Sequence, residues 1–150
     1  MIKKIILLLA LITFSSACDY SAVHSKKENN IEINITNLSG NNEINKYLSK
    51  ELKKKSKDSI EKIKIKINSS FSKRILAKDT KSFATDYELK LVGNFELIKG
   101  DKSKSFTISE KFRYKNLNDN YEQSNYEEMI KKNLIKNVVN KLILRINNFK

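Results

Sequence analysis

The sequence has no proline and no tryptophan, and only three glycines, one cysteine and one histidine among its 150 residues. One cysteine cannot form an internal disulfide, and together with one histidine it provides too few ligands for a structural zinc site. The glycines, at positions 40, 93 and 100, lie too far apart to form a phosphate-binding loop. A catalytic triad would have to use the single His24, so we expect no enzyme, no cofactor and no metal site.

The chain also lacks an apolar run long enough to cross a membrane, although its N-terminus is apolar. Lys3 and Lys4 precede the uncharged stretch Ile5–Phe14, and the small residues Ser15–Ala17 follow. A basic start, an apolar middle and a small-residue cleavage region are typical of a secretory signal peptide. Even extended to Ala17, the stretch is shorter than the roughly 20 residues of a membrane-spanning helix. We therefore expect residues 1–17 to be removed.

The only cysteine, Cys18, directly follows this cleavage region. Small residues that lead into one cysteine resemble a bacterial lipobox, which predicts that Cys18 is lipidated and carries palmitate-type acyl chains into the membrane. Ser15 departs from the leucine usual at its position, and an ordinary signal peptide with an incidental cysteine stays open. Asp19 favours inner-membrane retention in enteric bacteria, which leaves the inner membrane open as a destination beside the outer membrane.

Residues 18–30 show no apolar periodicity and are predicted to be a tether. The twelve residues after Cys18 can span at most about 40 Å when extended. His24 lies in this stretch, where a solvated side chain is expected rather than a metal ligand.

Two segments alternate between apolar and polar residues, as half-buried strands do. Isoleucines occupy positions 31, 33 and 35 in the first and positions 63, 65 and 67 in the second. The second pattern loosens through Asn68–Ser72 and resumes around Ile75. These segments predict two strands on either side of a connecting element.

The connecting element is predicted to be a helix. A turn is expected over Asn37–Asn42, and apolar residues then recur at helical spacing over residues 44–52. Asn41 or Asn42 can serve as the N-cap. Lys53–Lys55 end the helix, where cations suit the negative end of its dipole.

A long hairpin follows. Apolar residues lie at odd positions over residues 83–97 and at even positions over residues 106–114. Asp86 and Glu88 fall on the polar face of the first of these strands, where solvated carboxylates are expected. Gly100–Lys102 marks the turn, so the two strands should pair antiparallel. Gly93 interrupts the apolar series, where a bulge or a close approach of backbone is expected.

The chain ends in a long predicted helix. Ser124 and Glu127 have the spacing of a capping box, which places the N-cap at Ser124. One apolar stripe should face the core: Tyr126, Met129, Ile130, Leu134, Val138, Leu142, Ile146 and Phe149. The order β-α-β-β-β-α predicts one α+β domain over residues 31–150, a two-layer sandwich with a four-stranded, mostly antiparallel sheet and both helices on one face.

The strongest chemical signal is positive charge. The formal net charge is +13, and removal of Lys3 and Lys4 with the signal peptide would lower it to +11. Such a surface attracts nucleic acid, acidic lipid or phosphorylated glycolipid. Only three of the 30 basic residues are arginine, whereas base reading in DNA favours bidentate arginine. The abundance of Lys, Asn and Ile is also typical of an AT-rich genome, so composition accounts for part of this charge.

The order of segments resembles the LptE family of lipopolysaccharide-assembly lipoproteins. The resemblance runs through Tyr87–Leu89, the following hairpin, Phe112–Tyr114, Asn125–Glu128 and Asn133–Ile135. It implies a non-enzymatic protein that plugs the LptD β-barrel of the outer membrane, assists assembly of that barrel and helps to deliver lipopolysaccharide to the cell surface.

We hypothesise that the hairpin lysines Lys99, Lys102 and Lys104 contact the phosphates and acidic sugars of lipopolysaccharide, because loops at sheet ends are free to reach a ligand. Two other functions stay open. One is an auxiliary lipoprotein of an ABC-type lipid transport system, which Asp19 favours. The other is a basic nucleic-acid-binding domain, which would require that Cys18 is not lipidated; we expect no nucleic-acid partner.

Overall fold

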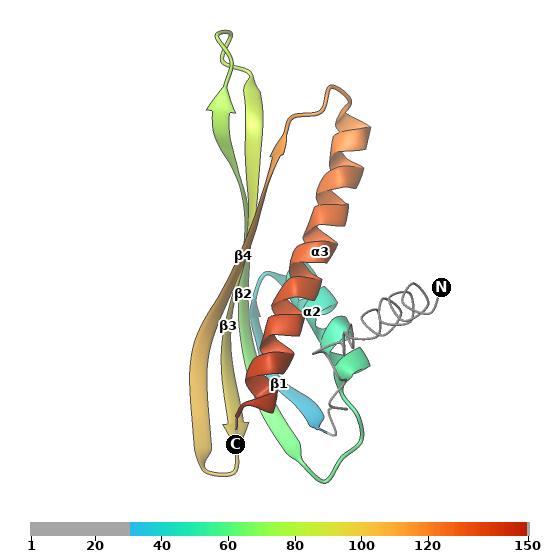
Figure 1. The fold of residues 1–150 in the computed structure, drawn as a ribbon, viewed down its shortest axis with the longest axis vertical. Coiled ribbons are helices and arrows are strands. Elements are labelled where there is room, and N and C mark those ends of the chain that lie inside the picture. Colours follow the sequence, from blue (N-terminus) through green and yellow to red (C-terminus); the bar gives the residue numbers. More distant parts are fainter. Residues whose placement is uncertain (1–30, 150) are drawn as a thin grey trace, which may run out of the picture.

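The computed structural model describes residues 31–149, and the predicted signal peptide, lipidated Cys18 and tether lie outside this range. Six elements follow one another (Figure 1): β1 (Glu32–Gly40), α2 (Asn42–Lys55), β2 (Lys62–Lys78), β3 (Ala84–Lys99), β4 (Lys102–Lys115) and α3 (Asn120–Asn147). The predicted order β-α-β-β-β-α and the α+β class are both confirmed.

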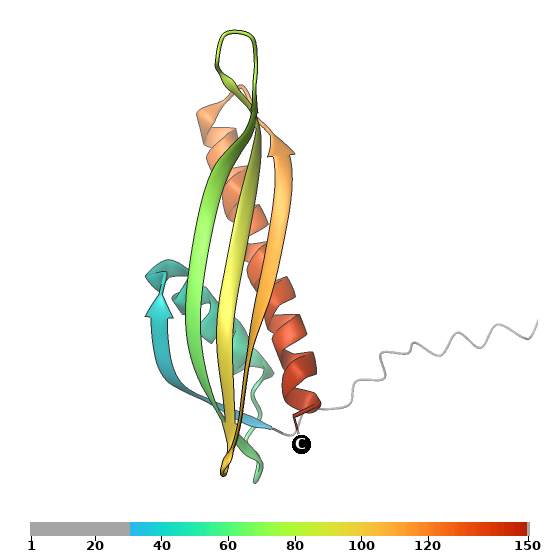
Figure 2. The same cartoon turned by 90° about the vertical axis from the view of Figure 1, so that its left-hand side faces the viewer.

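The strands form one sheet in the order β1-β2-β3-β4. β1 pairs parallel to β2, and the other two pairs are antiparallel. Both helices cover the same face, α2 over β1 and β2 and α3 over β3 and β4. Figure 2 looks onto the opposite face, which no helix or strand of residues 31–149 covers. We call it the open face.

The core lies between the sheet and the two helices. The alternation seen in the sequence places Ile63, Ile65 and Ile67 inward with no more than 1% of their surface exposed. Leu48 and Leu52 of α2 and the stripe of α3 pack against them. Near the N-terminal end of α3, Tyr114 stacks on Tyr87, with ring centroids 5.6 Å apart, and meets the edge of Tyr126, with ring centroids 5.8 Å apart. These contacts fix α3 on the sheet along its length.

The first two strands are longer than predicted. Residues 37–40, predicted as a turn, continue β1 to Gly40, because a bulge between Ile35 and Asn37 keeps the strand paired with β2. The chain then enters α2 directly, with Gly40 at φ +88° and Asn41 as the N-cap. β2 also runs without a break through residues 68–72, because β3 pairs with every residue of that stretch.

The last helix begins earlier than predicted. Asp119, not Ser124, is the N-cap, and its carboxylate accepts a hydrogen bond of 2.8 Å from the backbone N–H of Glu122. Glu127 cannot complete a capping box at Ser124, since its carboxylate is bonded to Lys73, Tyr114 and Gln123.

The predicted stripe of α3 is wrong at one position and too narrow. Met129 is 50% exposed in a groove beside β4, the edge strand of the sheet, whereas Ile135, Val139 and Ile143 join the core. In the hairpin, Gly93 has neither the bulge nor the close approach of backbone that was predicted, and the space of its missing side chain is taken by the ring of Phe95. A Cβ there would lie 2.5 Å from the ring of Phe95, and the pairing on both sides of Gly93 contains no bulge.

Candidate functional site

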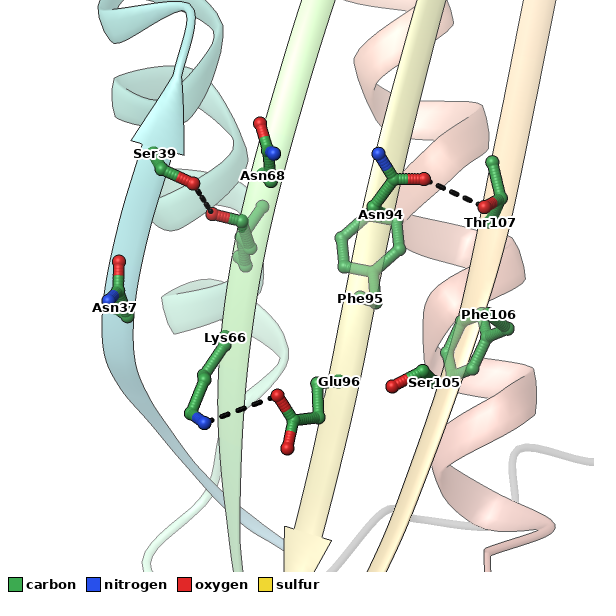
Figure 3. Close-up of a pocket in the computed structure, with 11 residues that line it drawn as sticks. Asn37, Ser39, Lys66, Asn68, Asn94, Phe95, Glu96, Ser105, Phe106 and Thr107 are labelled. Carbon is green, nitrogen blue, oxygen red and sulfur yellow. Dashed lines mark hydrogen bonds and ion pairs between the residues drawn. The ribbon is translucent and has the colours of Figure 1, made fainter.

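The open face carries one side chain in two from all four strands, and its two halves differ in chemistry. In the half near the β3–β4 turn, the central part is mostly uncharged and polar, as Figure 3 shows, and Lys62 and Lys64 lie closer to the turn. The half toward the β2–β3 hairpin carries a group of charged side chains, Arg74, Glu88, Lys90, Lys111 and Arg113. We call these five residues the open-face cluster.

The polar half forms a shallow hollow of about 560 Å³. One row across the strands consists of Ser39, Asn68, Asn94 and Thr107, and the Thr107 hydroxyl lies 2.7 Å from the Asn94 amide oxygen (Figure 3). The ion pair Lys66–Glu96, at 3.2 Å, closes the next row. Because these groups largely cancel in charge, the hollow offers hydrogen bonds to a polar surface rather than a site for an ion.

Glu88 lies between two arginines on the neighbouring strands. Its carboxylate is 2.8 Å from the Nη2 of Arg74 and 3.0 Å from the Nε of Arg113. The two guanidinium groups leave only 2% of the glutamate side chain exposed while they stay 62% exposed themselves. The hydrogen bond from Arg113, aided by Arg74 and opposed by lost hydration, holds the pKa of Glu88 below its usual value. One carboxylate thus orients two cations that still face solvent.

Lys90 and Lys111 stand directly opposite each other next to this triplet. Within residues 31–149, neither ammonium group has an ion-pair or hydrogen-bond partner. Like charges on directly opposed strand positions destabilise a sheet. Together with the two arginines they give the cluster four cations and one carboxylate, an arrangement that favours a multivalent anion such as a phosphate.

The three hairpin lysines lie at the other end of the sheet. Lys99 pairs with Lys102 across the turn, and the Lys99 ammonium is 2.6 Å from a carboxylate oxygen of Glu61. Lys104 is opposite Leu97, so it points to the helix-covered side at the edge strand. The structure therefore brings the three lysines to one hairpin, with one of them already neutralised.

The sequence pattern contained part of the signal for the open-face cluster. Once the turn is centred at residues 100 and 101, Glu88 must pair with Arg113 and Lys90 with Lys111. Arg74 could not be added, because the predicted break in β2 hid its register with β3. Glu88, expected to be a solvated carboxylate, is instead covered by its neighbours.

The described part of the chain contains no group of three or more Cys, His, Asp and Glu side chains that could hold a metal ion. No helix among residues 31–149 has the length and apolarity that a membrane span requires.

Comparison with known proteins assigns the chain to a family. Residues 29–146 match the family model LptE, described as lipopolysaccharide-assembly. The chain belongs to the LptE family. It is thereby a member of a family of lipopolysaccharide-assembly proteins. No curated protein matches the chain in sequence.

Solved structures share the fold at low sequence identity. Rare lipoprotein B from Shewanella oneidensis matches with a TM-score of 0.60 and 13% identity over 77% of this chain and 94% of its own. A putative lipoprotein from Caulobacter crescentus matches with a TM-score of 0.55 and 12% identity over 77% and 88%. Lipoprotein B from Nitrosomonas europaea matches with a TM-score of 0.52 and 18% identity over 79% and 83%. These LptE-like domains confirm the architecture of the sandwich.

Proposed function

We propose that this LptE-family chain is a non-enzymatic subunit of the outer-membrane lipopolysaccharide translocon. In this role it is anchored through Cys18, seated in the lumen of an LptD-type β-barrel whose assembly it assists, and binds lipopolysaccharide for delivery to the cell surface. The family match supports the process. The observation that carries the binding step is the open-face cluster, where two oriented arginines and two unpaired lysines face solvent.

The partner is tested by affinity purification of the tagged full chain from cells extracted with mild detergent. We expect a large outer-membrane β-barrel to copurify. Copurification of an inner-membrane ABC transporter instead would support the auxiliary lipoprotein that Asp19 favours. A full-length, unlipidated chain in the cytosol would overturn the assignment of Cys18 and with it the envelope function.

Lipopolysaccharide binding is tested with two charge reversals on the purified full chain. Lys90→Glu with Lys111→Glu removes the unpaired cations of the open-face cluster, and reversal of Lys99, Lys102 and Lys104 removes those of the hairpin. We propose both surfaces as contacts and expect the open-face pair to have the larger effect, because Lys99 is already paired with Glu61. Loss of two phosphate contacts should weaken binding at least tenfold, since one charge-assisted hydrogen bond contributes about 1.5–3 kcal/mol.

The matched control is Lys53→Glu with Lys55→Glu. These two lysines are exposed at the end of α2, on the helix side of the sheet and outside the open-face cluster, and their reversal changes the net charge by the same amount as reversal of the open-face pair. Equal losses in the control and the open-face pair would show that only overall charge matters, which would contradict a defined site. Unchanged affinity after the hairpin reversal would remove Lys99, Lys102 and Lys104 from the assignment.

A further inference from the structure

A groove lies between the free edge of β4 and α3, beside the open-face cluster. Its floor is formed by the buried side chains of Ile130 and Leu134, and its volume is about 190 Å³. Phe112 from β4 and Met129 from α3 stand along it and are 42% and 50% exposed. Two large apolar side chains thus remain in solvent at a site that is already concave.

The groove has the form of a narrow channel along the helix. Its lining runs from Tyr126 to Asn137 of α3, which corresponds to about 16 Å at 1.5 Å per residue. Its volume equals that of about six water molecules. A groove of this length and volume accommodates a segment of one unbranched chain and is too small for a helix, which is about 10 Å wide.

One residue connects the groove to the open-face cluster. Lys111 lines the groove, yet it faces Lys90 across the strand pair and has no partner for its ammonium among residues 31–149. Lysine commonly packs its methylenes on an apolar surface while its charge stays in solvent. Glu110, Asn133 and Asn137 also line the groove, and the Glu110 carboxylate is paired with Lys141. An apolar floor bordered by an unpaired cation matches a molecule with an anionic head and an apolar tail, not a purely apolar peptide.

We propose that the β4–α3 groove holds one acyl chain of a phosphorylated glycolipid whose phosphate is bound by Lys111 and Lys90. This inference rests on the proposed function and adds to it the part of the ligand that each surface contacts. Phosphate binding alone would require only the open face. The groove gives selectivity for an acylated ligand, because each buried methylene contributes a factor of about four in affinity.

Photocrosslinking in cells tests this placement with the full chain. A benzoylphenylalanine is introduced in separate variants for Met129 in the groove, for Ser109 on the open face and for Leu144. Leu144 is the matched control, because it is an apolar residue of the same helix, is 60% exposed and lies outside the groove. We expect lipopolysaccharide adducts at Met129 and Ser109, with a yield of acyl-chain adducts at Leu144 lower than at Met129 by about tenfold. Mass spectrometry should show the Met129 adduct attached to an acyl chain.

The outcomes separate the groove from the proposed function. Adducts at Ser109 without adducts at Met129 would leave lipopolysaccharide binding standing and overturn the groove. Adducts at neither position would contradict both. A protein adduct at Met129, from a barrel or a second copy of the chain, would identify the groove as a protein contact and overturn the inference.

A substitution provides the second measurement. Met129→Glu places a charge in the groove at a position that tolerates solvent, and we expect it to weaken binding of lipopolysaccharide to the purified full chain by tenfold or more while binding of inorganic phosphate is unchanged. Leu144→Glu should change neither. A loss of phosphate binding in Met129→Glu would show that the effect comes from charge and not from the groove.

Discussion

At the scale of single residues, one glutamate connects the sheet to α3. The carboxylate of Glu127 accepts hydrogen bonds from Lys73 and Tyr114, each at 2.6 Å, and from Gln123 at 3.0 Å. Partial burial raises the pKa of Glu127, but these three donors outweigh it and hold the pKa below its usual value. Burial, together with the bond to Glu127, raises the pKa of Tyr114. The pair therefore stays a neutral phenol and an ionised carboxylate across the neutral range.

The stability that Glu127 contributes should depend on pH. Since its pKa is lower in the folded chain than the ordinary value of 4.5, its contribution is present above that pH and is lost as the pH falls through the folded value. We expect Glu127→Gln to lower the free energy of unfolding by about 1 kcal/mol at pH 7, a value reduced by solvent screening. Urea unfolding of both chains from pH 7 to pH 3 should show the difference shrinking on acidification. A constant difference would mean that packing, not charge, is responsible.

The burial of single residues was predicted correctly where the alternation of apolar and polar residues alone decides it. The isoleucines of β2 are buried as their alternation indicated. The prediction was wrong where a partner from a distant strand decides, as at Glu88, whose solvation is removed by Arg74 and Arg113. It was also wrong at Met129, because helical spacing shows which face a residue lies on but not where the neighbouring sheet ends.

At the scale of elements, the boundaries depend on groups that compete for the same role. Two N-cap signals precede the core of α3, Asp119 and Ser124, and only the first is used. At the junction of β1 and α2, the predicted turn was replaced by a continuous strand. There the Asn45 amide donates to the Ser39 carbonyl and its oxygen accepts from the Ser69 hydroxyl, at 2.8 and 2.7 Å. The bond to Ser69 joins α2 to β2 across 24 residues of sequence, and local turn propensity does not predict such a contact.

The two cap signals predict different effects of mutation. Asp119→Ala removes the acceptor for the backbone N–H of Glu122, so we expect a loss of about 1 kcal/mol in stability and faster amide hydrogen exchange in the first turn of α3. Ser124→Ala serves as the control, and since Ser124 is exposed within the helix we expect a change below about 0.5 kcal/mol. A larger effect at Ser124 would indicate that the capping box forms in solution.

At the scale of the whole molecule, the two hairpins lie at opposite ends of the long sheet (Figure 1). β1 begins beside Lys62, and Lys64 is opposite Ile98, so the described chain starts at the end that carries the β3–β4 turn. The hairpin lysines are therefore near the point where the chain passes to residue 30. The open-face cluster and the β4–α3 groove lie farther along the sheet, toward the β2–β3 hairpin. A polar hollow separates the two basic surfaces.

The position of the chain start, at the end of the sheet that carries the β3–β4 turn, predicts how the domain is oriented relative to the bilayer. If Cys18 is the anchor, the twelve residues that follow it limit the distance of Ile31 from the membrane to about 40 Å. The sixteen residues of β3 add about 50 Å between the two hairpins. The β3–β4 turn should then lie closer to the bilayer than the β2–β3 hairpin, and its lysines would meet anionic headgroups before the open-face cluster does.

The orientation can be measured because lipidation would leave no other free cysteine in the chain. Lys102→Cys and Lys81→Cys place single labels at the two hairpins, and energy transfer to a bilayer-bound acceptor is recorded for the lipidated protein in lipid nanodiscs. We expect the efficiency at position 102 to be several-fold higher than at position 81. Equal efficiencies would show that the tether lets the domain tumble freely, in which case the orientation must come from the barrel partner. The comparison should therefore be repeated with the copurified barrel, where a reversed order would place the open-face cluster and the groove next to the bilayer.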